Sequence, residues 1–316
     1  MPIKRRKVAI VGAGAVGSTV ALNLVIQDIC EDVTIIDINK DKAWAEAMDL
    51  NHSIAYLNRN TNIISGEYED CKDADIVVIT AAPPYIMGQK RTDMLEKAAS
   101  IVKSIVDPIM KSGFNGIFIV VTNPVDVISY YVYKLSGLPA NQIIGTGTSL
   151  DSARLQNAIA DVMKVDPQSV VAYCLGEHGD SQMVPWSMVT VGAKNFLEIL
   201  KDNKERLNHI ILDKISSNTS EVAYKIMQGK GATNYAIAAT TAEIIRCIFK
   251  DLNKVIPVSA MLNGEYGIND VYAGVPAVIN GNGIKELVEL KLTNEENKKF
   301  QESVELIKKY NSMLPL

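Results

Sequence analysis

The first half of the 316-residue chain alternates short apolar runs with longer stretches in which apolar residues recur at helical spacing. The runs are rich in Val and Ile, as expected of strands that are buried on both faces. They lie at Val8–Val11, Val33–Ile36, Ile76–Thr80, Ile117–Thr122 and Ile143–Ile144. Strands that alternate with helices in this way predict βαβ units and a parallel sheet. Ligands of such sheets bind at the carboxyl ends of the strands.

The second half of the chain has a different pattern, with long helical stretches and fewer strands. The expected elements are a strand at Val170–Leu175, a hairpin from Met188 through Val258 to Tyr272, and helices over Asn203–Gln228 and Ala232–Lys250. Near the C-terminus, Thr293 and Glu296 have the spacing of a capping box that starts a last helix. The predicted fold class is therefore α/β: a doubly wound parallel sheet in residues 1–145 and a second, α+β domain in residues 146–316.

The composition argues against several classes of function. Apolar residues make up 47% and charged residues 22% of the chain, and the formal net charge is −4, so nothing favours nucleic acid as a partner. No apolar run reaches the ~18 residues of a membrane span, and the N-terminus lacks the apolar stretch of a secretory signal. The four cysteines are scattered, with no C-x-x-C pair and no histidine at metal-ligand spacing. We therefore expect a cytoplasmic protein with reduced thiols, no metal ion and no membrane partner.

The first apolar run breaks into glycines at the point where a helical pattern begins. Gly12, Gly14 and Gly17 form a G-x-G-x-x-G motif, in which the glycines allow a tight turn, close approach of a pyrophosphate and helix–strand packing. The phosphates would lie at the start of a helix over Ala15–Gln27. Glycines also end strands for structural reasons, but Asp37 ends the second run, twenty residues past Gly17. A carboxylate there binds ribose hydroxyls and repels a 2′-phosphate, which predicts NAD as the cofactor.

His178 lies in the run Gly176-Glu177-His178-Gly179-Asp180 and is one of three histidines in the chain. The glycines permit a tight loop and close approach of a ligand. Imidazole gains and loses a proton near neutral pH, so the run is typical of a general acid/base. The alternative is a hydrogen-bonded structural histidine in a turn. The presence of a dinucleotide motif in the same chain favours the catalytic interpretation.

Four motifs together resemble those of the L-lactate/malate dehydrogenase family in order and spacing. They are the segments Gly12–Gly17, Thr122–Asp126, Gly145–Arg154 and Gly176–Asp180. The resemblance runs from about Val8 to the C-terminal helix, and Ala47–His52 and Lys230–Thr233 bring it nearest the bacterial L-lactate dehydrogenase branch. It implies a Rossmann domain that binds NAD, a substrate domain in residues 146–316, a glycolytic lactate dehydrogenase activity, and a homotetramer or homodimer with a mobile loop over the active site.

The resemblance also implies roles for individual residues. His178 corresponds to the acid that protonates the carbonyl oxygen of a 2-oxo acid during hydride transfer, and Asp151 to the carboxylate that orients its ring. Arg154 corresponds to the clamp on the substrate carboxylate, and Arg91 to the loop arginine that polarises the carbonyl. Without the resemblance, Asp151 and Arg154 are equally consistent with a helix-surface ion pair, and Arg91 with a solvated loop cation.

The remaining implied residues line the substrate and the nicotinamide. Asn123 is expected at the substrate oxygen and beside the cofactor, although an Asn before Pro is also an ordinary turn residue. Thr233 is expected to contact the substrate, and Thr146 and Ile237 to line the nicotinamide pocket.

In this family one position, six residues before the loop arginine, largely sets the substrate. It holds glutamine in enzymes for lactate and arginine in enzymes for malate, whereas here it holds Tyr85. A second substrate carboxylate would be buried unpaired, which argues against malate dehydrogenase. Pyruvate and bulkier apolar 2-oxo acids both remain candidate substrates. Alternatively, Tyr85 points outward and does not set the substrate. A redox sensor that binds dinucleotide without turnover is disfavoured, because it has no need of a proton donor.

Overall fold

The computed structural model describes residues 4–57, 60–83, 91–208 and 210–316, apart from the side chains at 91–93, 218 and 220. A nine-stranded sheet has the order β12-β11-β10-β6-β5-β4-β1-β2-β3. Its parallel strands are β1 (Lys7–Val11), β2 (Asp32–Ile36), β3 (Asn62–Ser65), β4 (Ile76–Ile79), β5 (Ile117–Val120) and β6 (Ile143–Gly145). The order 3-2-1-4-5-6 is that of a dinucleotide-binding sheet. The predicted doubly wound fold is confirmed.

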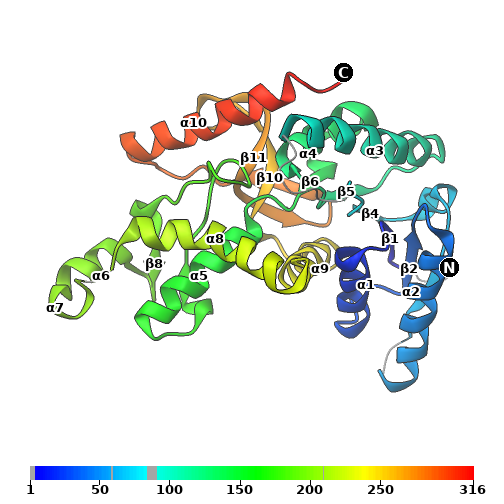
Figure 1. The fold of residues 1–316 in the computed structure, drawn as a ribbon, viewed down its shortest axis with the longest axis horizontal. Helices are drawn as coiled ribbons and strands as arrows, with labels where there is room; N and C mark the ends of the chain where they lie inside the picture. Colours follow the sequence, from blue (N-terminus) through cyan, green and yellow to red (C-terminus); the bar gives the residue numbers. More distant parts are fainter. Residues whose placement is uncertain (1–3, 58–59, 84–90, 209) are drawn as a thin grey trace.

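Helices cover both faces of this sheet (Figure 1). They include α1 (Ala15–Ile26), α2 (Lys40–Ser53), α3 (Arg91–Lys111), α4 (Val125–Ser136), α9 (Tyr235–Phe249) and α10 (Asn294–Asn311). In Figure 1, α3 and α4 lie on one side of the parallel strands, whereas α1 and α9 pack together on the other. The capping box expected at Thr293 and Glu296 is present at the start of α10. None of the described helices combines the length and apolarity needed to cross a membrane.

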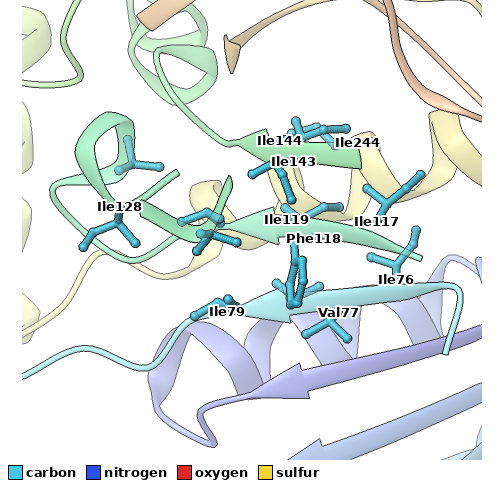
Figure 2. Close-up of a cluster of buried hydrophobic side chains, with 14 of the residues drawn as sticks. Ile76, Val77, Ile79, Ile117, Phe118, Ile119, Ile128, Ile143, Ile144 and Ile244 are labelled. Atoms are coloured by element: carbon cyan, nitrogen blue, oxygen red, sulfur yellow. The ribbon is translucent and has the colours of Figure 1, made fainter. Parts of the chain in front are cut away.

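The centre of the sheet is buried on both faces, as its continuous Val/Ile runs predict. All four residues of β4 and of β5 are buried. Figure 2 shows labelled side chains of β4 and β5 beside Ile143 and Ile144 of β6, with Ile128 from α4 and Ile244 from α9. Each such side chain stabilises the fold by about 1.5–3 kcal/mol when it is fully buried. This packing fixes the strand ends from which the loops of the site leave the sheet.

The second half of the chain extends the same sheet with antiparallel strands. These are β10 (Lys254–Asn263), β11 (Asn269–Asn280) and β12 (Gly283–Leu287). β10 joins the parallel part because Ser259 pairs with Gly145 of β6. The expected hairpin is therefore β10–β11, and its predicted start at Met188 is wrong. Met188 instead ends a short helical turn between two strands of a separate three-stranded sheet.

A smaller unit packs around its own apolar cluster, which includes Leu155, Ile159 and Phe196. It contains β7 (Val170–Val171), β8 (Thr190–Val191), β9 (Lys194–Asn195), α5 (Ser149–Met163), α6 (Phe196–Asp202), α7 (Lys204–Leu207) and α8 (Leu212–Lys230). The helix expected over Asn203–Gln228 is thus divided between α7 and α8. The strand expected over Val170–Leu175 is shorter, because only Val170 and Val171 pair with β8, whereas Leu175 pairs with Met183.

Candidate active site

The glycine-rich turn joins β1 to α1 at the carboxyl edge of the sheet. Gly12 has φ +110°, and a Cβ there would lie 2.7 Å from Thr80 Oγ1 and 2.8 Å from the backbone N of Ala81. A Cβ on Gly17 would lie 1.9 Å from the carbonyl oxygen of Gly12. The fold itself therefore requires glycine at positions 12 and 17. A Cβ on Gly14 meets no described atom within 4 Å, so the turn is open to a ligand on that side.

Asp37 closes the turn from the end of β2. Its Oδ2 accepts a hydrogen bond from the backbone N of Ala13 (2.7 Å), and its Oδ1 accepts one from the backbone N of Asn39 (2.9 Å). The first turn of α1 carries no acidic side chain, so its N–H groups and dipole favour a phosphate. The open side at Gly14, the bare helix N-terminus and the adjacent carboxylate together fit the pyrophosphate and ribose of a dinucleotide.

His178 and Asp151 form a close pair although 27 positions separate them. Nδ1 of His178 lies 2.6 Å from Oδ2 of Asp151, whose side chain is only 4% exposed. Burial lowers the pKa of His178, but the charge and hydrogen bond of Asp151 raise it more, so the pKa lies above its ordinary value. The pair therefore favours a proton on the ring. With 26% of its side chain exposed, His178 keeps part of the ring open to a ligand.

Arg154 contacts the same carboxylate from one turn further along α5. Its Nη1 lies 3.2 Å from Asp151 Oδ1, and its side chain is 14% exposed. The two residues do form an ion pair within α5, but both partners are largely enclosed rather than exposed at the helix surface. Burial raises the pKa of Asp151, whereas His178 and Arg154 lower it to a net value below the ordinary one. The guanidinium has five N–H donors, so one bond to Asp151 leaves capacity for a ligand carboxylate.

The other expected residues lie around the same sheet edge. Asn123 is exposed just after β5, before a cis peptide bond to Pro124, and Thr146 is buried just after β6. Thr233 and Ile237 are half-buried at the start of α9. That segment is tied to α1 where Asn234 Nδ2 donates to Thr19 Oγ1 (2.8 Å). These positions bring the substrate and nicotinamide candidates to the edge that carries the glycine turn.

Two expected residues cannot be placed. Tyr85 lies outside the described residues. Arg91 is the first residue of α3, but its side chain lies outside the described part of the chain. Within the described residues, no group of three or more His, Cys, Asp or Glu side chains is arranged to hold a metal ion.

Sequence reasoning assigned no role to two residues that contact this site. Asp126, in the first turn of α4, accepts a hydrogen bond from the backbone N of His178 (2.7 Å). Ser303, in α10, accepts one from the backbone N of Glu177 (2.8 Å). Asp126 could have been noticed in the sequence, because it is a carboxylate among the apolar residues that begin α4. Ser303 gave no such signal, because a serine in an amphipathic helix is ordinary.

Comparisons with known proteins agree with this geometry. Residues 6–145 match the NAD binding domain of lactate/malate dehydrogenases, and residues 148–313 match their alpha/beta C-terminal domain. L-lactate dehydrogenase 3 of Bacillus thuringiensis subsp. konkukian is 51% identical over 305 residues, 96% of either chain. L-lactate dehydrogenase of Macrococcus caseolyticus is 47% identical over the same shares. The structure of a minor L-lactate dehydrogenase from Enterococcus mundtii, in the ligands-bound form, superposes with a TM-score of 0.95 at 41% identity, covering 98% of this chain and 99% of that chain.

The position of Asp37 predicts a strong preference for NADH over NADPH. The wild-type protein should use NADH at least about tenfold more efficiently, a difference of about 1.4 kcal/mol, because a 2′-phosphate would meet the carboxylate. Asp37→Asn should lower the ratio of kcat/KM for NADH to kcat/KM for NADPH, since it removes the charge and keeps an acceptor for the N–H of Ala13. Asp32→Asn, at the other end of β2, is the control and should leave the ratio unchanged. Equal kcat/KM for both cofactors in the wild type would rule out this role.

Proposed function

Because the chain belongs to the lactate/malate dehydrogenase family, we propose that it is an NAD-dependent L-lactate dehydrogenase that interconverts pyruvate and L-lactate. The observation that carries the proposal is the buried Asp151 carboxylate, which contacts both His178 Nδ1 and Arg154 Nη1. A proton donor and a carboxylate clamp share one anchor, as reduction of a 2-oxo acid requires.

The chain's own side chains account for the proton transfer and for substrate orientation. NADH, when bound, supplies the hydride that reduces the carbonyl carbon. His178 donates a proton from Nε2 to the carbonyl oxygen during reduction and accepts one back during oxidation. Asp151 holds the ring through Nδ1 and stabilises its protonated form. In the direction of oxidation, the same pair receives the proton of the substrate hydroxyl.

The substrate carboxylate is bound by Arg154 in this proposal. A guanidinium pairs with a carboxylate through two parallel N–H bonds, which fixes the orientation of the carbonyl. Asn123 and Thr233 contact the substrate, and Asn123, Thr146 and Ile237 enclose the nicotinamide. Arg91 polarises the carbonyl from the segment at the start of α3. We assign the cofactor to residues 1–145 and the substrate-binding residues mainly to residues 146–316.

Other activities receive less support. A malate dehydrogenase needs a cation for the second carboxylate, and Tyr85 stands where the resemblance places that cation. A dehydrogenase for larger apolar 2-oxo acids is the second candidate, because Tyr85 is flanked by other apolar residues. A redox sensor without turnover has no use for the enclosed His178–Asp151 pair.

We also infer that the protein acts in the cytoplasm as a homotetramer or homodimer. Large apolar side chains are exposed on several helices, among them Trp44 of α2 and Tyr224 of α8, which are 59% and 53% exposed. A second copy of the chain is the partner that the resemblance to this family implies.

Substitution of His178 tests the proposed acid directly. His178→Asn should lower kcat for pyruvate reduction by about 10²–10⁴-fold, because it removes the proton donor. The Kd of NADH, measured by fluorescence titration, should stay nearly unchanged, since the ring acts at the substrate. The matched control is His52→Asn, an exposed histidine of α2. Retained turnover in His178→Asn would place the acid elsewhere.

Substrate choice is tested at Tyr85 with a panel of pyruvate, 2-oxobutyrate, 4-methyl-2-oxopentanoate, phenylpyruvate and oxaloacetate. Pyruvate should give the highest kcat/KM. Tyr85→Arg should raise kcat/KM for oxaloacetate relative to kcat/KM for pyruvate, because an unpaired buried carboxylate costs about 3–5 kcal/mol and the arginine would pair with it. Tyr56→Arg, at a tyrosine that is 93% exposed, controls for the added charge. If phenylpyruvate or 4-methyl-2-oxopentanoate is reduced as efficiently as pyruvate, the broader 2-hydroxyacid activity replaces the lactate assignment.

A further inference from the structure

Three consecutive backbone N–H groups hold the loop that carries His178, and each is bonded to a different segment of the chain. The bonds run from Gly176 N to the carbonyl of Gly274 in β11 (3.0 Å), from Glu177 N to Ser303 Oγ in α10 (2.8 Å), and from His178 N to Asp126 Oδ2 in α4 (2.7 Å). The first two acceptors are neutral. The third, which is bonded to the backbone of the proposed acid itself, is a carboxylate.

Asp126 is a buried carboxylate, 2% exposed, whose described hydrogen-bond donors are both neutral. Its Oδ1 accepts a hydrogen bond from Ser259 Oγ (2.6 Å), and Oδ2 accepts the one from His178 N. Burial raises its pKa to about 6, although both hydrogen bonds lower it. A neutral amide would make similar bonds at a lower desolvation cost. The charge therefore suggests a purpose beyond holding the loop.

We propose that Asp126 is a positioning residue for the reaction: it fixes the backbone of His178 and places a second negative charge near the imidazole. This inference rests on the proposed role of His178 as the acid. Asp151 then orients the ring through Nδ1, while Asp126 fixes the main chain from which the ring extends. The two carboxylates come from different helices, α5 and α4, so the ring position depends on the packing of both.

Among the described side chains, the charged groups that face His178 lie on α5, on α4 and in its own loop. Asp151 and Arg154 belong to α5, Asp126 belongs to α4, and Glu177 precedes His178 in its own loop. Asp151 and Asp126 raise the pKa of His178, and Arg154 lowers it. Glu177 raises the pKa of Asp126. Asp126 lies in the first turn of α4, where the helix dipole favours the charged carboxylate.

The test compares three variants by the pH midpoint of His178, read from NMR of ¹⁵N-histidine-labelled protein and assigned with His178→Asn. Asp126→Asn keeps an acceptor for His178 N and removes the charge, so the midpoint should fall by about one pH unit. Ser259→Ala should shift it in the same direction by less, because losing that hydrogen bond favours protonated Asp126. Ser303→Ala removes the neutral anchor of Glu177 N and should leave the midpoint unchanged.

Kinetics provide the second measurement. In Asp126→Asn, kcat/KM for pyruvate reduction should fall about tenfold above the midpoint, in proportion to the lost protonated form, while the Kd of NADH stays unchanged. An Asp126→Asn midpoint equal to that of the wild type, or a shift equal to that of Ser303→Ala, would overturn the inference. A wild-type protein that reduces no 2-oxo acid while the midpoint shift persists would instead refute the proposed function.

Discussion

The contact between the buried carboxylate of Asp151 and the imidazole of His178 is the interaction on which the proposed chemistry depends. Isolated burial would strip the proton from a histidine ring. The 2.6 Å contact reverses that tendency and raises the pKa of His178 above its ordinary value. The same carboxylate contacts Arg154, so the proposed proton donor and the proposed substrate clamp are both held by Asp151. A change at Asp151 is therefore expected to disturb acid–base chemistry and substrate orientation together.

The sheet makes this contact possible by joining the two halves of the chain. Asp151 follows β6, the last parallel strand, whereas the His178 loop is bonded to β11 through Gly176 and Gly274. β10 connects these two parts of the sheet, because its Ser259 pairs with Gly145 of β6 and also donates a hydrogen bond to Asp126. The segments that carry the proposed cofactor and substrate residues thus leave one continuous sheet rather than two bodies linked by a flexible segment. Such rigidity favours the fixed geometry that proton and hydride transfer require.

Much of the fold could be predicted because its signals are local. Val/Ile runs marked β1, β2, β4, β5 and β6, and the glycine spacing located the turn before α1. The sequence pattern did not predict β3, because it is a short edge strand with only two apolar residues, of which Ile64 is 42% exposed. The break between α7 and α8 and the shortened β7 depend on tertiary partners, which override local periodicity. In the site, motif resemblance led to His178, Asp151 and Arg154. The anchoring by Asp126 and Ser303 joins positions 52 and 126 residues apart, and no local pattern encodes it.

The central claim is that Asp151 keeps the proton on His178, and paired pH profiles of the two reaction directions test it most directly. In the wild type, kcat/KM for pyruvate reduction should fall as pH rises through the raised pKa of His178, whereas kcat/KM for lactate oxidation should rise through the same pH. In Asp151→Asn, both midpoints should move to lower pH by the same amount, because the larger of the two negative charges that offset burial of the ring is then lost. The account would be contradicted if neither midpoint moves, or if the midpoint moves for only one of the two reactions, pyruvate reduction or lactate oxidation.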